Sequence, residues 1–359
     1  MAPAIRDGVP LAPLTTLQLG GPARHLVEAT QESDIAEALR WATARALPVA
    51  ILGGGSNLVI ADAGFDGLVL RIATRGRRFE PGGDATLVTA AAGEPWDDLV
   101  AEVVARDLAG LECLSGIPGL AGATPIQNVG AYGQEVAETI HAVRVLERAS
   151  GEVRELPAEA CGFGYRDSAF KRAPDRFVVL GVTFALRPGG PPALRYRELA
   201  EALAGLPNPS LADTRATVLA LRARKSMVIA PADPNRRSAG SFFMNPIVAA
   251  RLASEVAARA GVADAEMPRW PAGAGRVKLA AGWLIERAGI AKGMRRGAVG
   301  VSTAHALALV HHGGGTTAEL VALAAEIRNR VRDRFGVTLV PEPTFLGFPP
   351  GFSWNAFAG

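Results

Sequence analysis

Hydrophobic residues along the first third of this chain alternate between two spacings, which predict helices and strands in turn. In residues 34–46 the apolar positions recur at the spacing of an amphipathic helix, which Ser33 or Asp34 would cap. The apolar run within residues 47–57 predicts a short buried strand that ends in a glycine turn. Further strands are expected at residues 67–72 and 86–93, and a further helix at residues 96–110. The pattern therefore predicts an α/β layer.

Neither spacing continues through residues 114–136, where glycines, prolines and small residues accumulate. An irregular stretch of this length inside a compact domain is usually functional. Residues 141–147, 151–156 and 176–187 then have the composition of strands and predict a second sheet region. The Pro/Gly cluster at residues 188–192 marks a turn or a domain boundary.

Helical spacing predominates in the C-terminal part of the chain. Asn245 and Pro246 suit an N-cap and a first helical position, which places Ser241 in the loop before that helix. Thr316 and Glu319 fit a capping box at the start of a long helix. Helices are expected at residues 213–226, 246–261 and 279–289, and a strand at residues 304–315. These elements predict a separate α/β domain.

The length and composition are those of a globular protein with more than one domain. A chain of 359 residues and 37.3 kDa is long for a single core and favours two or three domains. Hydrophobic residues make up 49% and charged residues 20%, as in ordinary globular proteins. No apolar run is long enough to cross a bilayer, and the first residues lack the apolar core of a signal peptide. A cytoplasmic protein without membrane insertion is expected.

Positive charge is spread along the chain rather than gathered in one block. The formal net charge is +3 and the isoelectric point is about 9.1. The arginine pairs at positions 77–78, 236–237 and 295–296 are most simply solvated surface, with small anionic ligands as a second interpretation. Because no aromatic and basic motif accompanies them, a nucleic-acid partner is not expected.

The cysteines and histidines exclude several kinds of site. Cys113 and Cys161 lie far apart and outside any Cys-x-x-Cys spacing, so neither a disulfide framework nor a metal site is indicated. Both are expected to be small buried hydrophobic residues. The five histidines show no context of a catalytic triad, so an activated serine nucleophile is not expected.

Two glycine-rich segments are candidates for binding a phosphate group. Closely spaced glycines at positions 53–55 let backbone N–H groups approach an anion that Cβ atoms would block. Leu58 stands where a G-x-G-x-x-G motif needs its third glycine, and no Gly-Lys-Ser/Thr is present, so a plain glycine turn is the alternative. The second segment, residues 115–136, would complement the first, since two backbone-lined loops can clasp a diphosphate and cover a flat cofactor ring. Its alternative is a loop with many turns.

Three single residues have unusual surroundings: Arg166 in GYRDSAFK, Ser241 in GSFFMNP and Glu342 in LVPEPTFLG. Taken singly, each has a simpler interpretation. Arg166 would form a surface salt bridge, Ser241 would bond to local backbone, and Glu342 would be an exposed acid at the end of a strand. Taken in order with the two glycine-rich segments and LAAGWLIERAG, they form one series of six motifs.

This series resembles the UDP-N-acetylenolpyruvoylglucosamine reductase family of bacterial cell-wall synthesis, from residue 15 to about residue 347. The resemblance implies an α+β protein with a vanillyl-alcohol-oxidase-like (PCMH-type) FAD-binding fold of two subdomains and a C-terminal α/β substrate-binding domain. The implied flavin subdomains are residues 1–75 and 76–215, with the FAD-binding region at about 18–188. The implied substrate domain is residues 216–340, and a C-terminal segment, residues 341–359, carries Glu342.

The implied activity is the FAD-dependent reduction of UDP-N-acetylglucosamine enolpyruvate to UDP-N-acetylmuramate, with NADPH as the source of hydride. Hydride addition leaves negative charge beside the substrate carboxylate, which the planar cation of Arg166 would stabilise. Ser241 would donate the proton that completes the reduction, because an enolate-like carbon is a strong base. Glu342 would act as a protonated hydrogen-bond donor, which requires a raised pKa. The implied partners are small molecules only, and the enzyme is expected to be a monomer.

Further positions match binding residues of the family. The expected FAD contacts are Gly53, Gly54, Gly55, Ser56, Asn57, Gly116, Ile117, Pro118, Gly119, Gly122, Ala123, Gln127, Asn128, Gly130, Ala131 and Tyr132. The expected substrate contacts are Tyr165, Tyr196, Lys225, Asn245 and Lys278. Tyr196 fits the form of the family that folds a tyrosine-bearing loop over the substrate. Arg222 and Lys278 are further helpers, for which plain surface charge is the alternative.

The sequence departs from the family pattern at Glu286-Arg287, where many members have an acid and a glutamine, and at Pro343-Thr344, where many have Val-Arg. Residues 225–241 also form a longer segment than in some relatives. Two rival functions stay open: an oxidase of an alcohol or sugar on the same flavin-binding fold, and a catalytically silent nucleotide-binding module. Oxidation by oxygen without NADPH would favour the first, and a protein purified without flavin absorbance would favour the second.

Overall fold

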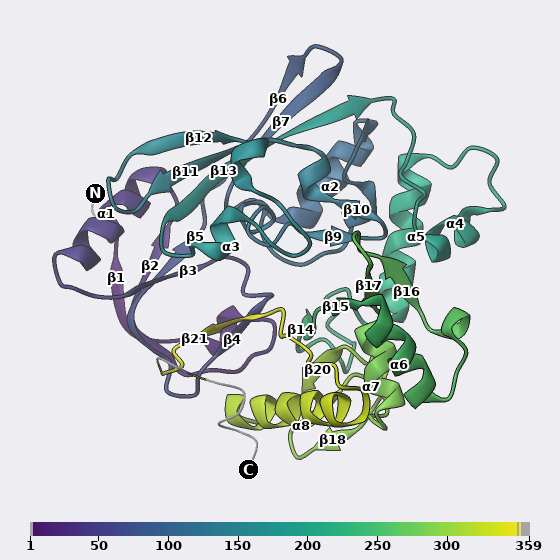
Figure 1. Cartoon of the computed structure of the whole chain (residues 1–359). Helices are drawn as coiled ribbons and strands as arrows, with labels where there is room; N and C mark the ends of the chain where they lie inside the picture. The colour runs from purple at the N-terminus through teal and green to yellow at the C-terminus, as the bar shows by residue number, and fades with distance from the viewer. Residues whose placement is uncertain (1–2, 350–351, 353–359) are drawn as a thin grey trace. The chain divides into compact units, whose positions relative to one another are not determined.

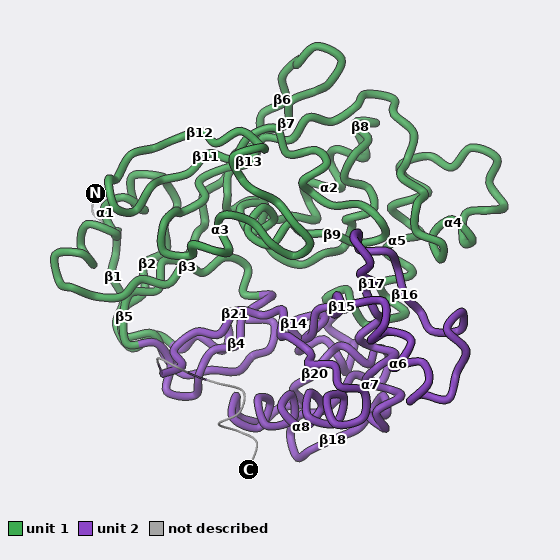
Figure 2. Tube along the Cα trace, viewed as in Figure 1, with its two compact units in different colours: residues 1–9, 23–55, 66–229 green, residues 10–22, 56–65, 230–359 purple. Residues whose placement is uncertain are grey.

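The computed structural model describes residues 3–349 and 352, and it groups the chain into two compact units. Unit 1 contains residues 1–9, 23–55 and 66–229, and unit 2 contains residues 10–22, 56–65 and 230–359 (Figure 2). Two short segments from the first part of the chain therefore belong to the unit that the last third builds.

The first sheet of unit 1 has the strand order β1-β2-β5-β3 (Figure 1). Its strands are β1 (Ile5–Pro10), β2 (Pro22–Ala29), β5 (Phe65–Ile72) and β3 (Val49–Leu52). The strands β3 and β5 run parallel, with Val49 opposite Leu68, and the helix α1 (Glu32–Thr43) connects β2 to β3. The run Leu68 to Leu70 in β5 is fully buried, which confirms the strand expected at residues 67–72.

The helix α1 begins earlier than its sequence pattern predicts. Its N-cap is Gln31, and the Asp34 carboxylate accepts hydrogen bonds from the backbone N–H groups of Thr30 and Gln31 at 2.9 Å each. The prediction that Ser33 or Asp34 is the cap was wrong. Asp34 instead reaches back from the third helical position, as the acid of a capping box does.

The second sheet of unit 1 has the order β12-β11-β13-β7-β6 and is antiparallel. Its strands are β6 (Arg77–Gly82), β7 (Ala85–Ala91), β11 (Ile140–Glu147), β12 (Val153–Pro157) and β13 (Phe177–Pro188), and β8 (Leu108–Ala109) pairs with the end of β13. The four strands expected from residue 86 to residue 187 are confirmed. The strand β6 was not predicted, because it is an edge strand made mainly of charged and turn-forming residues.

The helix α2 (Trp96–Ala105) anchors the irregular stretch of unit 1. The Trp96 ring lies 5.8 Å from that of Phe184 in the core, and its indole N–H donates to the carbonyl of Leu114 at 3.0 Å. The helix ends at Ala105 rather than near Gly110, because Asp107 takes a left-handed φ of 56° and the chain then enters β8. The start of the glycine-rich stretch is thus fixed from the core.

Residues 114–136 form no long element, as expected. They contain the short strands β9 (Gly130–Ala131) and β10 (Gln134–Glu135) and a single-turn 3₁₀ helix at Ala121–Ala123. The later helices of unit 1 are α3 (Ala169–Arg172), α4 (Arg197–Leu203) and α5 (Leu211–Arg224). Ser210 caps α5 in a capping box with Asp213, so this helix starts slightly before the predicted residue 213.

The described residues of unit 2 form three small sheets and three α-helices (Figure 1). The sheet orders are β14-β20-β19-β18, β15-β17-β16 and the parallel pair β21-β4. The strands are β4 (Leu58–Ile60), β14 (Ser238–Ser241), β15 (Ile247–Ala249), β16 (Arg269–Pro271), β17 (Arg276–Leu279), β18 (Arg295–Arg296), β19 (Val299–Val301), β20 (Ala308–His311) and β21 (Thr344–Leu346). The helices are α6 (Ala250–Ala260), α7 (Ala281–Arg287) and α8 (Thr317–Phe335). One face of α8 buries Leu320, Ile327 and Phe335 in the core of this unit.

The N-terminus of α8 has a full set of partners. The predicted capping box is confirmed: the Thr316 hydroxyl accepts from the N–H of Glu319 at 3.1 Å, and the Glu319 carboxylate accepts from the N–H of Thr316 at 2.8 Å. Asp62, which follows β4, accepts from the N–H groups of Thr317 and Ala318 at 2.7 and 2.9 Å. These carboxylates also complement the positive end of the helix dipole.

The helix expected to start at Pro246 starts later. Residues 247–249 instead form β15, in which Ile247 lies opposite Lys278 of β17, and α6 begins at Ala250. The Asn245 side chain does cap a helix, because its Oδ1 accepts from the N–H of Ala281 at the start of α7, at 2.9 Å. The prediction was wrong because the capped helix lies far along the chain from Asn245.

Two expectations from composition can be compared with the structure. Cys113 and Cys161 are both buried, as expected, and burial raises the pKa of their thiols to about 12 and about 11. Arg77 is not plain solvated surface, because it forms ion pairs at 2.8 Å with Glu94 and Glu102. In the part of the chain that the structure describes, no helix is long and apolar enough to cross a membrane.

Candidate active site

The two glycine-rich segments meet through their backbones in unit 1. A Cβ atom on Gly54 would lie 2.8 Å from the Cα of Gly119, closer than real Cβ atoms approach a backbone. The carbonyl of Gly119 accepts a hydrogen bond from the N–H of Trp96 at 3.0 Å, so this backbone cannot easily move. Glycine is therefore required at position 54, and the contact leaves backbone groups rather than side chains at the surface of both loops.

Arg166 lies in a tight turn that is fastened to the second glycine-rich segment. Gly164 and Asp167 pair backbone to backbone across this turn. The Nη2 of Arg166 donates to the carbonyl of Gly130 at 2.6 Å, and the Asn128 amide donates to the carbonyl of Gly164 at 3.0 Å. These two bonds in opposite directions hold the guanidinium group beside the glycine-rich segment.

Backbone strain is concentrated in the same part of unit 1. Asn128, Tyr132 and Arg166 have φ values of 45°, 48° and 54°, although none of them is glycine. Eight such residues occur in the described chain, and these three are predicted site residues. A left-handed non-glycine residue costs on the order of 1 kcal/mol or more and persists where its surroundings hold it, often at functional sites. The strain therefore favours a functional loop over an ordinary series of turns.

Tyr132, Tyr196 and Lys225 come together in unit 1. The two rings lie edge to face with centres 5.3 Å apart, and the Nζ of Lys225 lies 5.8 Å from the centre of the Tyr132 ring. Lys225 also forms an ion pair with Glu198. Burial raises the pKa of Tyr132 to about 12 and raises the pKa of Tyr196, so both phenols are neutral at neutral pH. A residue predicted to contact the cofactor thus lies beside two predicted to contact the substrate.

Arg222 is not plain surface charge. Its Nη2 donates to the carbonyl of Met227 at 2.6 Å, while its Nε is buried and has no hydrogen-bond partner among the described residues. Burial lowers the pKa of Arg222. A Cβ on Gly116 would lie 3.4 Å from this Nε, so the unpaired N–H lies beside the second glycine-rich segment. A buried N–H group without a hydrogen-bond acceptor is rare in proteins, unless a ligand or a water molecule accepts the bond.

Sequence reasoning missed the residues that hold Gly116 in place. The Oδ1 of Asp97 accepts from the N–H of Gly116 at 2.6 Å, and Arg215 binds both oxygens of the Asp97 carboxylate at 2.6 and 2.9 Å. Burial pushes the pKa of Asp97 upward, but the bonds from Arg215 and Gly116 outweigh it and the pKa lies below its ordinary value. The only signal in the sequence is an acid in the first turn of a helix, which is common without any site.

A bulge in β14 sets the position of Ser241. Ser238 lies opposite Val310 and Ser241 opposite Ala308, so β14 has one residue more than its partner between these pairs. Gly240 supplies the extra residue with a left-handed φ of 71°. Beyond it, the N–H of Phe242 donates to the carbonyl of Leu307 at 2.7 Å. The bulge re-aims the chain immediately before Ser241.

The two phenylalanines after Ser241 explain the rest of the GSFFMNP motif. Phe242 and Phe243 are 0% and 1% exposed, with ring centres 5.2 Å apart in the core of unit 2, whereas Ser241 is partly exposed. Phe243 pairs with Pro341, and the N–H of Glu342 donates to the carbonyl of Phe242 at 2.9 Å. Ser241 and Glu342 are therefore held on neighbouring, hydrogen-bonded backbones.

Glu342 is tied to the GGGSN motif as well. The N–H of Thr344 donates to the carbonyl of Asn57 at 3.0 Å, and the Asn57 amide donates to the carbonyl of Glu342 at 3.5 Å. These bonds extend the parallel pairing of β21 with β4, in which Thr344 lies opposite Leu58. The departure from the family pattern at Thr344 thus falls on the first residue of a strand.

Lys278 lies in the sheet β15-β17-β16, opposite Ile247, and Asn245 lies two residues before that partner. The N–H of Leu279 donates to the carbonyl of Pro246 at 2.9 Å, which extends the antiparallel pairing toward Asn245. The Nζ of Lys278 lies 5.8 Å from the centre of the Trp270 ring. The other departure, Glu286-Arg287, is exposed at the end of α7, where Glu286 pairs with Lys292 at 3.5 Å.

The remaining predicted contacts belong to the glycine-rich segments. In unit 1 these are Gly53, Gly55, Ile117, Pro118, Gly122, Ala123, Gln127 and Ala131, and in unit 2 they are Ser56 and Asn57. The N–H of Gly122 donates to the carbonyl of Ala92 at 2.9 Å, a contact that a side chain at position 122 would prevent. Of the three predicted catalytic residues, Arg166 belongs to unit 1, and Ser241 and Glu342 belong to unit 2.

Comparisons with known proteins agree with these features. Residues 23–157 match the family model of an FAD binding domain, and residues 233–346 match that of the C-terminal domain of UDP-N-acetylenolpyruvoylglucosamine reductase. The chain is 52% identical over 348 residues to a protein of that name from Saccharopolyspora erythraea, which covers 94% of this chain and 95% of the relative. It is 52% identical over 347 residues to one from Streptomyces coelicolor, which covers 94% of this chain and 89% of the relative.

A solved structure gives the same result for the fold. The structure of UDP-N-acetylenolpyruvylglucosamine reductase from Thermus caldophilus superposes with a TM-score of 0.65 at 26% identity, and the match covers 96% of this chain and 100% of that one. The expected α+β FAD-binding fold is confirmed, and the protein is of the flavoprotein class. Within that class, the chain belongs to the UDP-N-acetylenolpyruvoylglucosamine reductase family.

Proposed function

We propose that this protein uses FAD and NADPH to reduce UDP-N-acetylglucosamine enolpyruvate to UDP-N-acetylmuramate, a step of peptidoglycan synthesis. The observation that carries the proposal is the placement of Ser241 after a strand bulge, on a backbone bonded to that of Glu342. It occurs in a chain 52% identical over most of its length to named reductases of this substrate. We further propose that the enzyme is a cytoplasmic monomer whose partners are small molecules.

The finer division of the chain is also a proposal. We propose flavin subdomains at residues 1–75 and 76–215, a substrate domain at residues 216–340, and a C-terminal segment that contributes Glu342. The separate sheets β1-β2-β5-β3 and β12-β11-β13-β7-β6 support the boundary near residue 75.

The residues of unit 1 fit FAD. A cradle of backbone groups lies where Gly54 approaches Gly119, and the unpaired Nε of Arg222 beside Gly116 offers a buried donor to a phosphate oxygen. FAD bound there would supply redox chemistry, because it can take up hydride from NADPH and give it to the enolpyruvyl group. The chain's own contribution is to hold the diphosphate on backbone N–H groups and to keep the loops in a fixed shape.

Gly54→Ala is expected to weaken FAD binding about tenfold or more, equivalent to roughly 1.4 kcal/mol. The added Cβ would lie 2.8 Å from the Cα of Gly119, so the two loops must separate. Gly205→Ala is the matched control, because a Cβ at position 205 meets nothing within 4 Å. Flavin retained after purification and the affinity measured by titration of the apoprotein are the readouts. Equal affinities in the two variants would contradict the proposed FAD contact.

Arg166, Ser241 and Glu342 divide the work on the substrate. Reduction leaves negative charge next to the substrate carboxylate, and the fixed guanidinium of Arg166 stabilises that charge without reorganising. The Ser241 hydroxyl donates a proton to the substrate carbon that carries this negative charge. Glu342, in its protonated form, donates a hydrogen bond to the substrate carboxyl group rather than repelling it.

A two-step anaerobic absorbance experiment tests the proposed function. Addition of NADPH to the purified protein is expected to bleach the flavin bands, and addition of UDP-N-acetylglucosamine enolpyruvate is expected to restore them. Restoration by oxygen alone, after reduction by an alcohol or sugar, would instead identify an oxidase. A preparation without flavin bands, even after incubation with FAD, would contradict the proposal and favour a silent module.

A further inference from the structure

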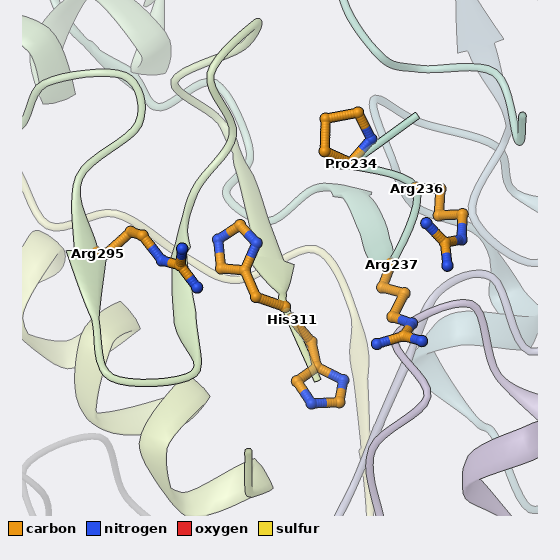
Figure 3. Close-up of a pocket in the computed structure, with 6 residues that line it drawn as sticks. Pro234, Arg236, Arg237, Arg295 and His311 are labelled. Carbon is orange, nitrogen blue, oxygen red and sulfur yellow. The ribbon is translucent and has the colours of Figure 1, made fainter. Parts of the chain in front are cut away.

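Three arginines, from two of the pairs singled out in the sequence, line one cavity of unit 2. The cavity has a volume of about 330 Å³ and is lined by Pro234, Arg236, Arg237, Arg295, His311 and His312. Figure 3 shows Arg295 on one side, Arg236 and Arg237 on the other, and His311 between them. No acidic side chain is among these lining residues of the described chain.

The wall of the cavity is held rigidly. The Asn235 side chain donates to the Thr303 hydroxyl at 2.9 Å and accepts from the Thr303 N–H at 3.1 Å, which fixes the loop that carries Arg236 and Arg237. On β20, the Nδ1 of His311 bonds to the carbonyl of Leu17 at 3.0 Å, and its Nε2 accepts from the N–H of Gly315 at 3.1 Å. One ring nitrogen donates and the other accepts, so this pattern describes a neutral imidazole with a fixed orientation.

The arginines of this cavity lack carboxylate partners. Among the described residues, Arg236, Arg237 and Arg295 form no ion pair, whereas the neighbouring Arg296 pairs with Glu326 at 2.8 Å. Arg236 reaches only a backbone carbonyl, that of Asp233, at 3.3 Å. Uncompensated positive charge gathered in a concave site attracts an anion.

Two buried nitrogen atoms beside the cavity are also unsatisfied. The Nε of Arg237 and the Nε2 of His312 are buried without a hydrogen-bond partner among the described residues. Burial lowers the pKa of His312, and the adjacent Arg295 lowers it further. Buried polar atoms are almost always bonded in native proteins, so both nitrogens are placed to meet a polar ligand.

The start of α8 is not the source of this site. Its first N–H groups already donate to Asp62 and Glu319. The cavity is also distinct from the proposed reaction centre, because neither Ser241 nor Glu342 is among the described residues that line it.

We propose that this cavity binds the diphosphate group of a small phosphorylated molecule. The planar fork of a guanidinium group matches phosphate oxygens in pairs, and three such groups face one space. A volume of about 330 Å³ corresponds to roughly eleven water molecules, which exceeds a single phosphate and accommodates a diphosphate. The proposal does not depend on the activity proposed above.

Histidine resonances provide a local test. The chain has five histidines, so their imidazole NMR signals can be assigned by substitution, and each reports binding at its own position. Titration of the holoenzyme with inorganic pyrophosphate is expected to shift the His311 and His312 signals saturably, while the His25 and His141 signals stay in place. Parallel titrations with inorganic phosphate and with ATP distinguish a diphosphate site from one for single phosphates or for whole nucleotides.

Charge removal provides the matched variants. The double variant Arg236→Gln and Arg295→Gln is expected to bind pyrophosphate at least tenfold more weakly at this site, while Arg251→Gln, an exposed arginine of α6, leaves the affinity unchanged. A thermal unfolding curve equal to that of the unaltered protein excludes misfolding. The proposal is wrong if the His312 signal shows no saturable shift, or if the double variant binds pyrophosphate as tightly as the unaltered protein.

Discussion

Ser241→Ala is expected to lower the turnover of UDP-N-acetylglucosamine enolpyruvate by about 10³- to 10⁴-fold, near the upper range for loss of a general acid. The alanine keeps the bulge at Gly240 and the two buried phenylalanines, so the fold and the flavin are retained. Bleaching of the flavin by NADPH proceeds at its normal rate, because that half-reaction needs no proton from Ser241. Stopped-flow absorbance of each half-reaction separates the two effects.

Ser254→Ala is the control for this experiment. Ser254 lies exposed on α6 in the same unit and its hydroxyl bonds to Asp264 at 2.8 Å, so its loss should leave both half-reactions unchanged. Near-normal turnover of Ser241→Ala would show that water or another group donates the proton. A defect confined to NADPH oxidation would likewise remove Ser241 from the proposed role.

Glu342→Ala is expected to lower turnover about 10²- to 10³-fold, the usual cost of losing one preorganised hydrogen-bond donor. Glu342→Gln is expected to keep most of the activity, because its amide can still donate a hydrogen bond and carries no charge. The backbone bonds from Glu342 to Phe242 and Asn57 do not involve the carboxyl group, so both variants should fold. Steady-state kinetics of the two variants over a range of pH give the comparison.

The activities of Glu342→Gln and Glu342→Ala, compared with each other, test the proposed role of Glu342. If the glutamine variant loses as much activity as the alanine variant, an ionised or proton-transferring carboxyl group is required and the donor role is wrong. Glu255→Ala on α6 is the control, since Glu255 pairs with Arg251 and Arg259 on the same helix, at 3.3 and 3.6 Å. It should leave turnover unchanged.

Elements with strong local signals were predictable from the sequence. The capping box of Thr316 and the apolar run along β13 are properties of neighbouring residues, so they were predictable locally. The edge strand β6 was missed because pairing with β7, rather than its own composition, makes it a strand. Asn245 was assigned to the wrong helix because a capping side chain does not reveal which N–H groups it reaches.

Some residues of the candidate site were also predictable from the sequence, and others were not. Residues with a recognisable motif, such as Arg166 and Ser241, were predicted by resemblance, and their roles stay predictions. Asp97 and Arg215 were missed, since Asp97 bonds the Gly116 backbone and Arg215 bonds Asp97, each from a distant part of the chain. The cavity at Arg236 and Arg295 needed the fold as well, because only the strand order of β14, β20, β19 and β18 brings those arginines to one place.

The parallel pairing of β4 with β21 has a consequence for synthesis on the ribosome. Leu58 leaves the ribosome early, but its partner Thr344 is made almost at the end of the chain. At about 5 to 20 residues per second, the interval is on the order of tens of seconds. During that time the apolar residues of β4, and the carboxylate of Asp62 that caps α8, have no completed unit to join. A nascent chain released early would leave β4 without its partner strand.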